Sequence, residues 1–185
     1  MEFKSLCNKA FTPRKLHRVS GLRQIINYTH GSKWATSPLY QVLQESLGYN
    51  FLFGGEQDSD ASYAARVAVT STNEIATRGI VISNYCRISA QQNYDFLRAV
   101  SPDKEMKLWE AAAATAAATP YFKPFAHQTT EAVYLDGAFQ NNNPAKVGHI
   151  EGQLIWKDVH SKPPDLFLSV GTSQNLEKVA RELQA

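Results

Sequence analysis

The segment AVYLDGAFQNNNP, residues 132–144, decides how the fold of this 185-residue chain is interpreted. Its apolar run predicts a strand that ends near Asp136, and Gly137 allows the chain to turn while leaving the carboxylate approachable. Asn143-Pro144 is typical of a helix start, whose free N–H groups can hold a nearby polar group. A carboxylate at the end of a buried strand lies where α/β proteins place their chemistry. Taken alone, however, such an aspartate is more often a turn or capping residue.

Further regular elements are predicted on both sides of this segment. The β-branched runs 66–70 and 79–82 favour a hairpin, and the apolar run 166–170 predicts another strand. Helices are expected to start at Ser37-Pro38 (with Gly48 as C-cap), at Ser101-Pro102 (leading into the alanine run 111–118), at Asn143-Pro144 and at Leu176. The stretches 54–62 and 124–130 are interpreted as loops. The alternation of strands and helices in the last third predicts βαβ units, so residues 1–185 are interpreted as one α/β domain.

The composition excludes several classes of protein. Hydrophobic residues make up 43% and charged residues 19%, which is typical of a globular chain and not of a disordered one. No apolar run approaches the roughly 20 residues of a membrane-spanning helix, and no secretory signal follows Met1. Two cysteines are too few for a disulfide framework, so a reducing compartment, the cytoplasm, is expected.

The formal net charge of +2 is unevenly distributed along the chain. Residues 1–33 hold seven Lys or Arg and one Glu, a charge of +6, whereas the remaining 152 residues hold twelve basic and sixteen acidic residues, a charge of −4. A basic end can bind phosphate, which suggests peripheral contact with an anionic membrane, although a solvated surface is the simpler interpretation. Neither zinc-finger spacing nor interleaved aromatic and basic residues indicate a nucleic-acid partner.

The order of the motifs resembles that of the patatin-like phospholipase family, in particular its fungal members. The turn Asp136-Gly137-Ala138, followed by Asn143-Pro144, is similar to the C-terminal motif of that family. Other segments resemble the family in the same order along nearly the whole chain: Phe11–Arg14, Asn27–Gly31, Phe53–Gly55, Trp109–Thr115, Tyr121–Phe125 and Asp165–Thr172. An ordered set of this kind is far more specific than any one of its members.

The resemblance implies a three-layer α/β fold with a mixed, mainly parallel sheet. It also implies a lipid acyl hydrolase of the phospholipase A or lysophospholipase type, which uses a Ser–Asp dyad and needs neither a metal nor an organic cofactor. The serine of a Gly-x-Ser-x-Gly elbow attacks the ester carbonyl, and an upstream glycine-rich loop stabilises the oxyanion. Asp136 matches the dyad aspartate. Ala138 stands where a second glycine is more usual, and it fits that position if its φ is negative.

The nucleophile of such a dyad is not found in this chain. No Gly-x-Ser-x-Gly occurs in residues 1–185, and the family places that motif before the segment that Phe3–Cys7 resembles. We therefore expect a domain that is incomplete on its N-terminal side and inactive on its own. Gly171-Thr172-Ser173 comes near the elbow pattern but lacks the closing glycine, so a structural turn is favoured over a nucleophilic Ser173.

Two hypotheses from different functional classes stay open. The first is part of a lipid acyl hydrolase whose serine lies outside this chain, for which the sequence does not separate hydrolysis from acyl transfer. The second is a non-catalytic patatin-like remnant or interaction module of a larger multidomain protein. The expected partners are a lipid or phospholipid substrate for the first hypothesis and other domains of a larger chain for the second. The expected location is the cytoplasm, with peripheral contact to membranes.

Overall fold

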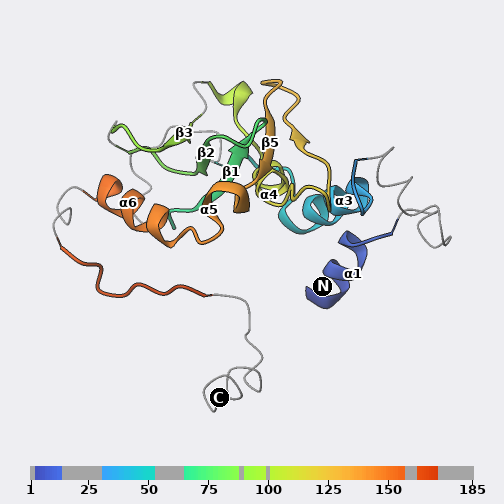
Figure 1. Cartoon of the computed structure of the whole chain (residues 1–185), viewed down its shortest axis with the longest axis horizontal. Coiled ribbons are helices and arrows are strands. Elements are labelled where there is room, and N and C mark those ends of the chain that lie inside the picture. Colours follow the sequence, from blue (N-terminus) through green and yellow to red (C-terminus); the bar gives the residue numbers. More distant parts are fainter. Residues whose placement is uncertain are drawn as a thin grey trace, which may run out of the picture.

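The computed structural model describes residues 3–13, 31–52, 65–87, 90–98, 101–156 and 162–170 (Figure 1). The predicted loop 54–62, the turn at Ser173 and the helix from Leu176 lie outside these residues. The described helices are α1 (Phe3–Ala10), α3 (Thr36–Leu47), the 3₁₀ helix η1 (Pro102–Lys104), α4 (Leu108–Thr115), α5 (Ala138–Asn141) and α6 (Ala145–Ile155). The strands are β1 (Ala68–Asn73), β2 (Gly79–Ser83), β3 (Tyr94–Leu97), β4 (Phe125–Ala126) and β5 (Val133–Asp136).

The strands form one mixed five-stranded sheet in the order β3-β2-β1-β5-β4. The predicted hairpin is confirmed as β1 and β2, which pair antiparallel with Val69 opposite Ile82. β5 pairs antiparallel with both β1 and β4, whereas β2 and β3 are parallel. The α/β class and the mixed sheet are therefore confirmed, but among the described residues the antiparallel pairings outnumber the parallel one. Strand β4 also lies inside the stretch 124–130, which was predicted to be a loop.

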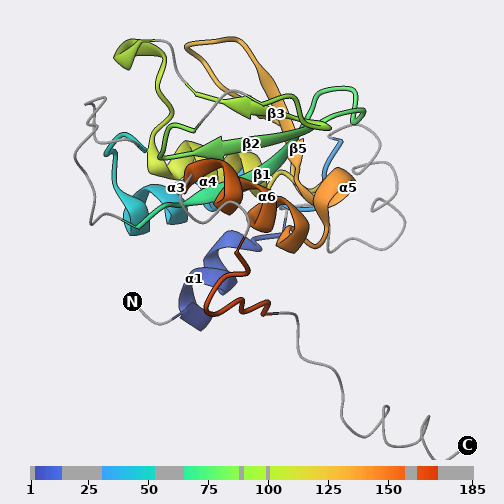
Figure 2. The same cartoon turned by 90° about the vertical axis from the view of Figure 1, so that its left-hand side faces the viewer.

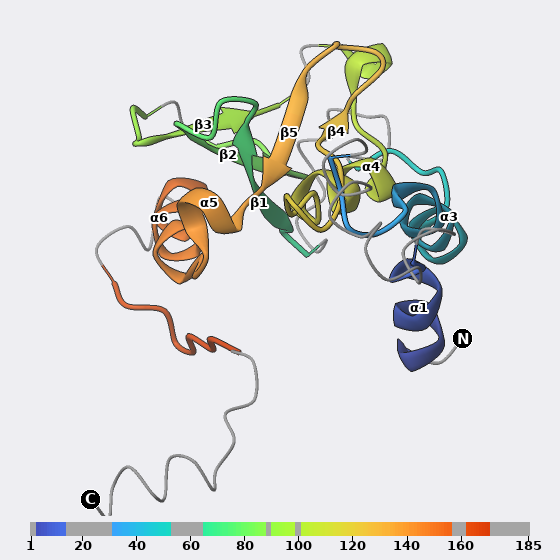
Figure 3. The same ribbon diagram turned by 45° about the vertical axis from the view of Figure 1, so that its right-hand side comes forward.

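Helices cover both faces of the sheet and give the predicted three layers. Consecutive residues of β2 point to opposite faces, so that Val81 packs with Val147 of α6 and Ile82 packs with the buried alanines of α4. Figure 2 shows α6 on the face of the sheet nearer the viewer, and α3 and α4 lie on the far side. Helix α1 packs on α3, away from the sheet (Figure 3).

Two predicted helix starts are confirmed with small shifts in position. Helix α3 begins at Thr36, just before the predicted Ser37-Pro38, and Gly48 ends it with a φ of +67° while its N–H donates to the carbonyl of Gln44 at 2.9 Å. Helix α6 follows Asn143-Pro144, as predicted. Ser37 is not the N-cap that was predicted, because it lies inside the first turn of α3 and Ala35 occupies the cap position without a side-chain hydrogen bond. Gly48 acts through its own backbone conformation, and Asn143 acts through its bond to the nearby N–H of Ala145.

The helix predicted from Ser101 through the alanine run is wrong in its extent. Only the 3₁₀ helix η1 follows Ser101, and the alanine helix α4 begins separately at Leu108 and ends at Thr115. The break has a tertiary cause, because the carbonyl of Met106 accepts from the N–H of Leu52 and the N–H of Leu108 donates to the carbonyl of Asn50, both at 2.9 Å. An extended backbone held by these bonds cannot continue a helix.

The strand predicted at Leu166–Val170 is also wrong. These residues belong to no strand and are highly exposed, with 81% of Leu166 and 85% of Val170 accessible. A strand exists only where a neighbouring strand completes its hydrogen bonds, and no described strand pairs with this segment. The βαβ unit predicted for the last third is consequently not formed among the described residues.

Candidate functional site

Asp136 occupies the place that the sequence predicted, because it is the last residue of β5 and is half-buried. Its N–H donates to the carbonyl of Ala117 at 3.1 Å, beyond the C-terminal end of α4. Its side-chain Oδ1 accepts from the N–H of Ala138 at 2.6 Å, which fixes the carboxylate at the start of α5. Backbone atoms at the end of a strand therefore hold the carboxylate in one orientation. A side chain that takes part in a reaction needs such a fixed position.

Gly137 is required here by space and not by an unusual backbone conformation. Its φ of −63° is open to any residue. A Cβ atom at this position would come closer than 3.0 Å to both the carbonyl oxygen and the hydroxyl of Thr70 on β1. Glycine thus lets the Asp136 turn press directly against β1. Ala138 is helical with a negative φ, as the motif requires.

We expect Gly137→Ala to lower the free energy of unfolding by on the order of 1–3 kcal/mol, because the added methyl group displaces either the turn or the end of β1. Urea denaturation measures the change. Gly148→Ala on α6 is the matched control, since nothing lies within 4 Å of its added Cβ. Alanine is the better helix former, so the control should stabilise the chain by up to about 1 kcal/mol. Equal effects of the two substitutions would contradict a steric role for Gly137.

Hydroxyl groups around the turn bind main-chain carbonyls and hold the ends of β1 and β5 together. The Thr115 hydroxyl donates to the carbonyl of Thr70 at 2.6 Å, and the Thr72 hydroxyl donates to that of Asp136 at 2.9 Å. Ser71 lies directly opposite Asp136 in the strand register. It is nevertheless no nucleophile in this arrangement, because it is fully buried and its hydroxyl donates to the carbonyl of Leu135 at 2.7 Å.

The residues after the turn border a large cavity on the α6 face of the sheet. Asn143 Oδ1 accepts from the N–H of Ala145 at 3.0 Å and so starts α6, while Asn143 and Pro144 lie at the cavity wall. The cavity has a volume of about 690 Å³ and is also lined by Thr70 of β1 and by residues 167–170. Because Thr70 contacts the Asp136-Gly137 turn from β1, the cavity adjoins the motif, although Asp136 itself does not line it.

A buried ionic network closes one wall of this cavity, and sequence reasoning missed it. Glu151 of α6 is only 3% exposed and accepts hydrogen bonds from the hydroxyls of Tyr85 at 3.0 Å and Tyr94 at 2.6 Å. The guanidinium of Arg87 lies 3.0 Å from the same carboxylate and 4.3 Å from the centre of the Phe96 ring. Burial and the hydrogen bond to Glu151 raise the pKa of both phenols, which therefore stay protonated and keep donating.

A second buried polar residue, His127, lies near the other end of β5. Its Nδ1 is 2.8 Å from the hydroxyl of Thr130, and burial lowers the pKa of the ring. The imidazole is therefore neutral near pH 7, which suits a structural role between the sheet and α4. No group of three His, Cys, Asp or Glu in the described part of the chain is placed to hold a metal ion. Nor does any helix in that part have the length and apolarity to cross a membrane.

The fold and the site together define a class of protein: a three-layer α/β domain with an aspartate fixed at a strand end and a glycine packed against the neighbouring strand. The sequence model of the patatin-like phospholipase family matches residues 3–148, a range that includes the whole turn and Asn143-Pro144. The chain therefore belongs to the patatin-like phospholipase family, and this membership suggests the lipid acyl hydrolase class. A comparison with curated proteins found no match.

Proposed function

We propose that this chain is part of a lipid acyl hydrolase in which Asp136 is the general base of a Ser–Asp dyad. The observation that carries the proposal is the position of Asp136, inside the family match and at the end of β5, with its Oδ1 held by the N–H of Ala138 at 2.6 Å. A carboxylate that is half-buried and oriented in this way can accept a proton from a nearby hydroxyl.

The proposed chemistry proceeds in two steps. In the first, the serine hydroxyl gives its proton to the Asp136 carboxylate as its oxygen forms a bond to the ester carbonyl carbon. The tetrahedral intermediate then collapses, the ester C–O bond breaks, and the leaving alcohol takes the proton from Asp136, which leaves an acyl-enzyme. In the second step, Asp136 takes a proton from water as the water oxygen attacks the acyl carbon. The bond from that carbon to the serine oxygen then breaks, and Asp136 returns the proton to the serine oxygen, which releases the fatty acid and restores both groups. This route uses neither a metal nor an organic cofactor.

The serine in this proposal comes from outside residues 1–185. The support is the sequence itself, which contains no Gly-x-Ser-x-Gly. Ser71 is buried with its hydroxyl donated, and Ser173 lacks the closing glycine of an elbow. We propose a phospholipase A or lysophospholipase substrate class, peripheral contact with membranes, no nucleic-acid partner, and further domains in a larger parent chain.

The alternative is a patatin-like scaffold without catalysis, which acts as an interaction module. It is favoured by the same absence of an elbow motif from these residues. The hydroxyl network and the steric fit of Gly137 would then serve only to stabilise the turn. The two functions differ in whether a reactive serine ever meets Asp136.

Labelling with a fluorophosphonate probe distinguishes the two functions. The 185-residue chain is compared with a form that carries the sequence encoded in frame before Met1. We expect labelling of the longer form alone, lost when its elbow serine is replaced by alanine. Labelling of the short chain that disappears in Ser173→Ala would reassign the nucleophile. If the longer form stays unlabelled, the scaffold without catalysis is the better description.

A further inference from the structure

Four side chains from three segments form a partly exposed cluster, which we call the aromatic–lysine patch: Phe11, Lys33, Trp34 and Tyr121. The ammonium of Lys33 lies 5.1 Å from the centre of the Trp34 ring and 5.6 Å from that of Tyr121, within the range of cation–π contacts. The ring of Phe11 meets that of Trp34 edge to face at 6.0 Å. Phe11 and Tyr121 remain 49% and 48% exposed, whereas Lys33 and Trp34 are half-buried, so the patch presents two aromatic rings to solvent beside a positive charge.

The backbone holds this patch in a fixed shape. The N–H of Trp34 donates to the carbonyl of Tyr121 at 2.9 Å, and the N–H of Ala35 donates to that of Thr12 at 3.2 Å. These bonds join the segment after α1, the segment before α3 and the turn after α4. The exposed rings are therefore supported by three parts of the fold and do not depend on one loop.

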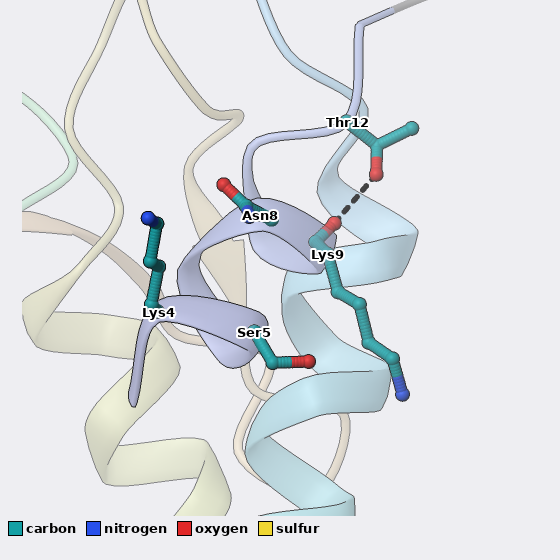
Figure 4. Close-up of a pocket in the computed structure, with 5 residues that line it drawn as sticks. All are labelled: Lys4, Ser5, Asn8, Lys9 and Thr12. Carbon is teal, nitrogen blue, oxygen red and sulfur yellow. Dashed lines mark hydrogen bonds between the residues drawn. The ribbon is translucent and has the colours of Figure 1, made fainter. Parts of the chain in front are cut away.

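The three segments that carry the patch contain charged side chains of one sign only. Residues 3–13, 31–36 and 119–124 contain four lysines and no acidic residue: Lys4, Lys9, Lys33 and Lys123. On α1, Lys4 and Lys9 extend from different sides of the helix, next to a surface hollow that Ser5, Asn8 and Thr12 also line (Figure 4). Lys9 has an acidic neighbour on another element, Glu45 of α3, at 3.4 Å in an exposed pair.

We propose that the aromatic–lysine patch is a docking surface for the headgroup region of an anionic lipid bilayer. Trp and Tyr concentrate at the boundary between headgroups and acyl chains because their rings are apolar while their N–H or O–H groups are polar. Lysines next to them are attracted to anionic headgroups. A protein partner fits less well, because protein interfaces are depleted in lysine.

The patch is connected to the candidate site through one turn. The N–H of Asp136 donates to the carbonyl of Ala117 at 3.1 Å, and the N–H of Tyr121 donates to the carbonyl of Ala118 at 2.7 Å. A bilayer bound at the patch therefore lies against the same short segment, 117–122, that positions the aspartate. This inference deepens the proposed function and rests on it for the use of a lipid substrate, whereas binding to vesicles is independent of turnover.

The test is co-sedimentation of the 185-residue chain with vesicles of phosphatidylcholine containing about one third phosphatidylserine. We expect Lys33→Glu, a change of two charges, to weaken binding by roughly 25-fold, since one lysine at such a surface is equivalent to about fivefold. Tyr121→Ser should weaken binding by roughly fivefold or more through lost aromatic contact. Binding should also fall as salt is added and should be weak on pure phosphatidylcholine.

Two matched control substitutions distinguish binding through the patch from non-specific binding by other charged or apolar side chains. Lys146→Glu makes the same charge change on the exposed surface of α6, across the sheet, and should alter binding by less than about twofold. Leu168→Ser removes an apolar side chain that is 77% exposed and should have as little effect. The inference is overturned if Lys146→Glu weakens vesicle binding as much as Lys33→Glu does, or if Leu168→Ser weakens it. It is also overturned if the unchanged chain does not sediment with the vesicles. A failed labelling experiment with intact vesicle binding would refute the catalytic proposal alone.

Discussion

Asp136→Asn, made in the form that carries an elbow serine, is expected to lower turnover of a lipid ester by roughly 10²- to 10⁴-fold, the usual contribution of a general base. The amide keeps the size of the side chain, and its oxygen can still accept from the N–H of Ala138, so the turn should persist. What it loses is the ability to take the serine proton. Steady-state kinetics with a soluble ester measures the loss without involving membranes.

The same substitution at another aspartate shows whether the loss of turnover is specific to Asp136. Asp103→Asn removes an exposed carboxylate from the 3₁₀ helix η1 and should leave turnover within about twofold. Thermal melting of both variants should resemble that of the unchanged protein. If Asp136→Asn retained full turnover with an intact fold, Asp136 would be a turn residue, which is the simpler interpretation of an aspartate before a glycine.

The turn at Asp136 could be predicted because its signals are local. An apolar run, a glycine and an Asn-Pro pair each act on their own backbone or on the next few residues, and the hairpin of β1 and β2 also needed only neighbouring residues. The role of Gly137 could not be predicted in the same way. The atoms that exclude a Cβ there belong to Thr70, far away in the chain.

The errors in the predicted fold arise where distant segments decide the outcome. The break before α4 depends on backbone bonds to residues 50–52, and a helical alanine pattern contains no information about them. The run Leu166–Val170 is as apolar as a buried strand, but no described strand pairs with it. Strand β3 was missed because Asp95 interrupts its apolar residues, whereas the aspartate of β5 stands at the end of an unbroken apolar run.

Glu151 had a usable signal in the sequence. It lies at helical spacing between Val147 and Leu154, on the face of α6 that is buried. A carboxylate on an apolar face must be paired, since an isolated buried charge is too costly to keep. What the pattern could not supply was the identity of its partners, because Arg87 and the two tyrosines come from around β2 and β3.

Glu151→Ala is accordingly expected to produce the largest loss of stability among these substitutions, about 3–5 kcal/mol. The substitution leaves the guanidinium of Arg87, whose side chain is 5% exposed, without its buried counter-charge. It also removes the acceptor of the Tyr85 and Tyr94 hydroxyls, which join α6 to the sheet. Urea denaturation followed by circular dichroism measures the change in the free energy of unfolding.

The exposed ion pair of Lys9 and Glu45 shows how much of the expected loss of stability is due to the burial of Glu151. Their atoms are 3.4 Å apart, but about half of each side chain is in solvent, so Glu45→Ala should cost less than about 1 kcal/mol. Replacing Glu151 and Arg87 together by leucine and methionine should recover much of the loss, because no unpaired charge then remains buried. Similar costs for Glu45→Ala and Glu151→Ala would show that α6 is held by apolar packing and not by the buried carboxylate. No recovery in the double variant would assign the loss to the Tyr85 and Tyr94 hydroxyls, which lose their acceptor in both variants, and not to the guanidinium of Arg87.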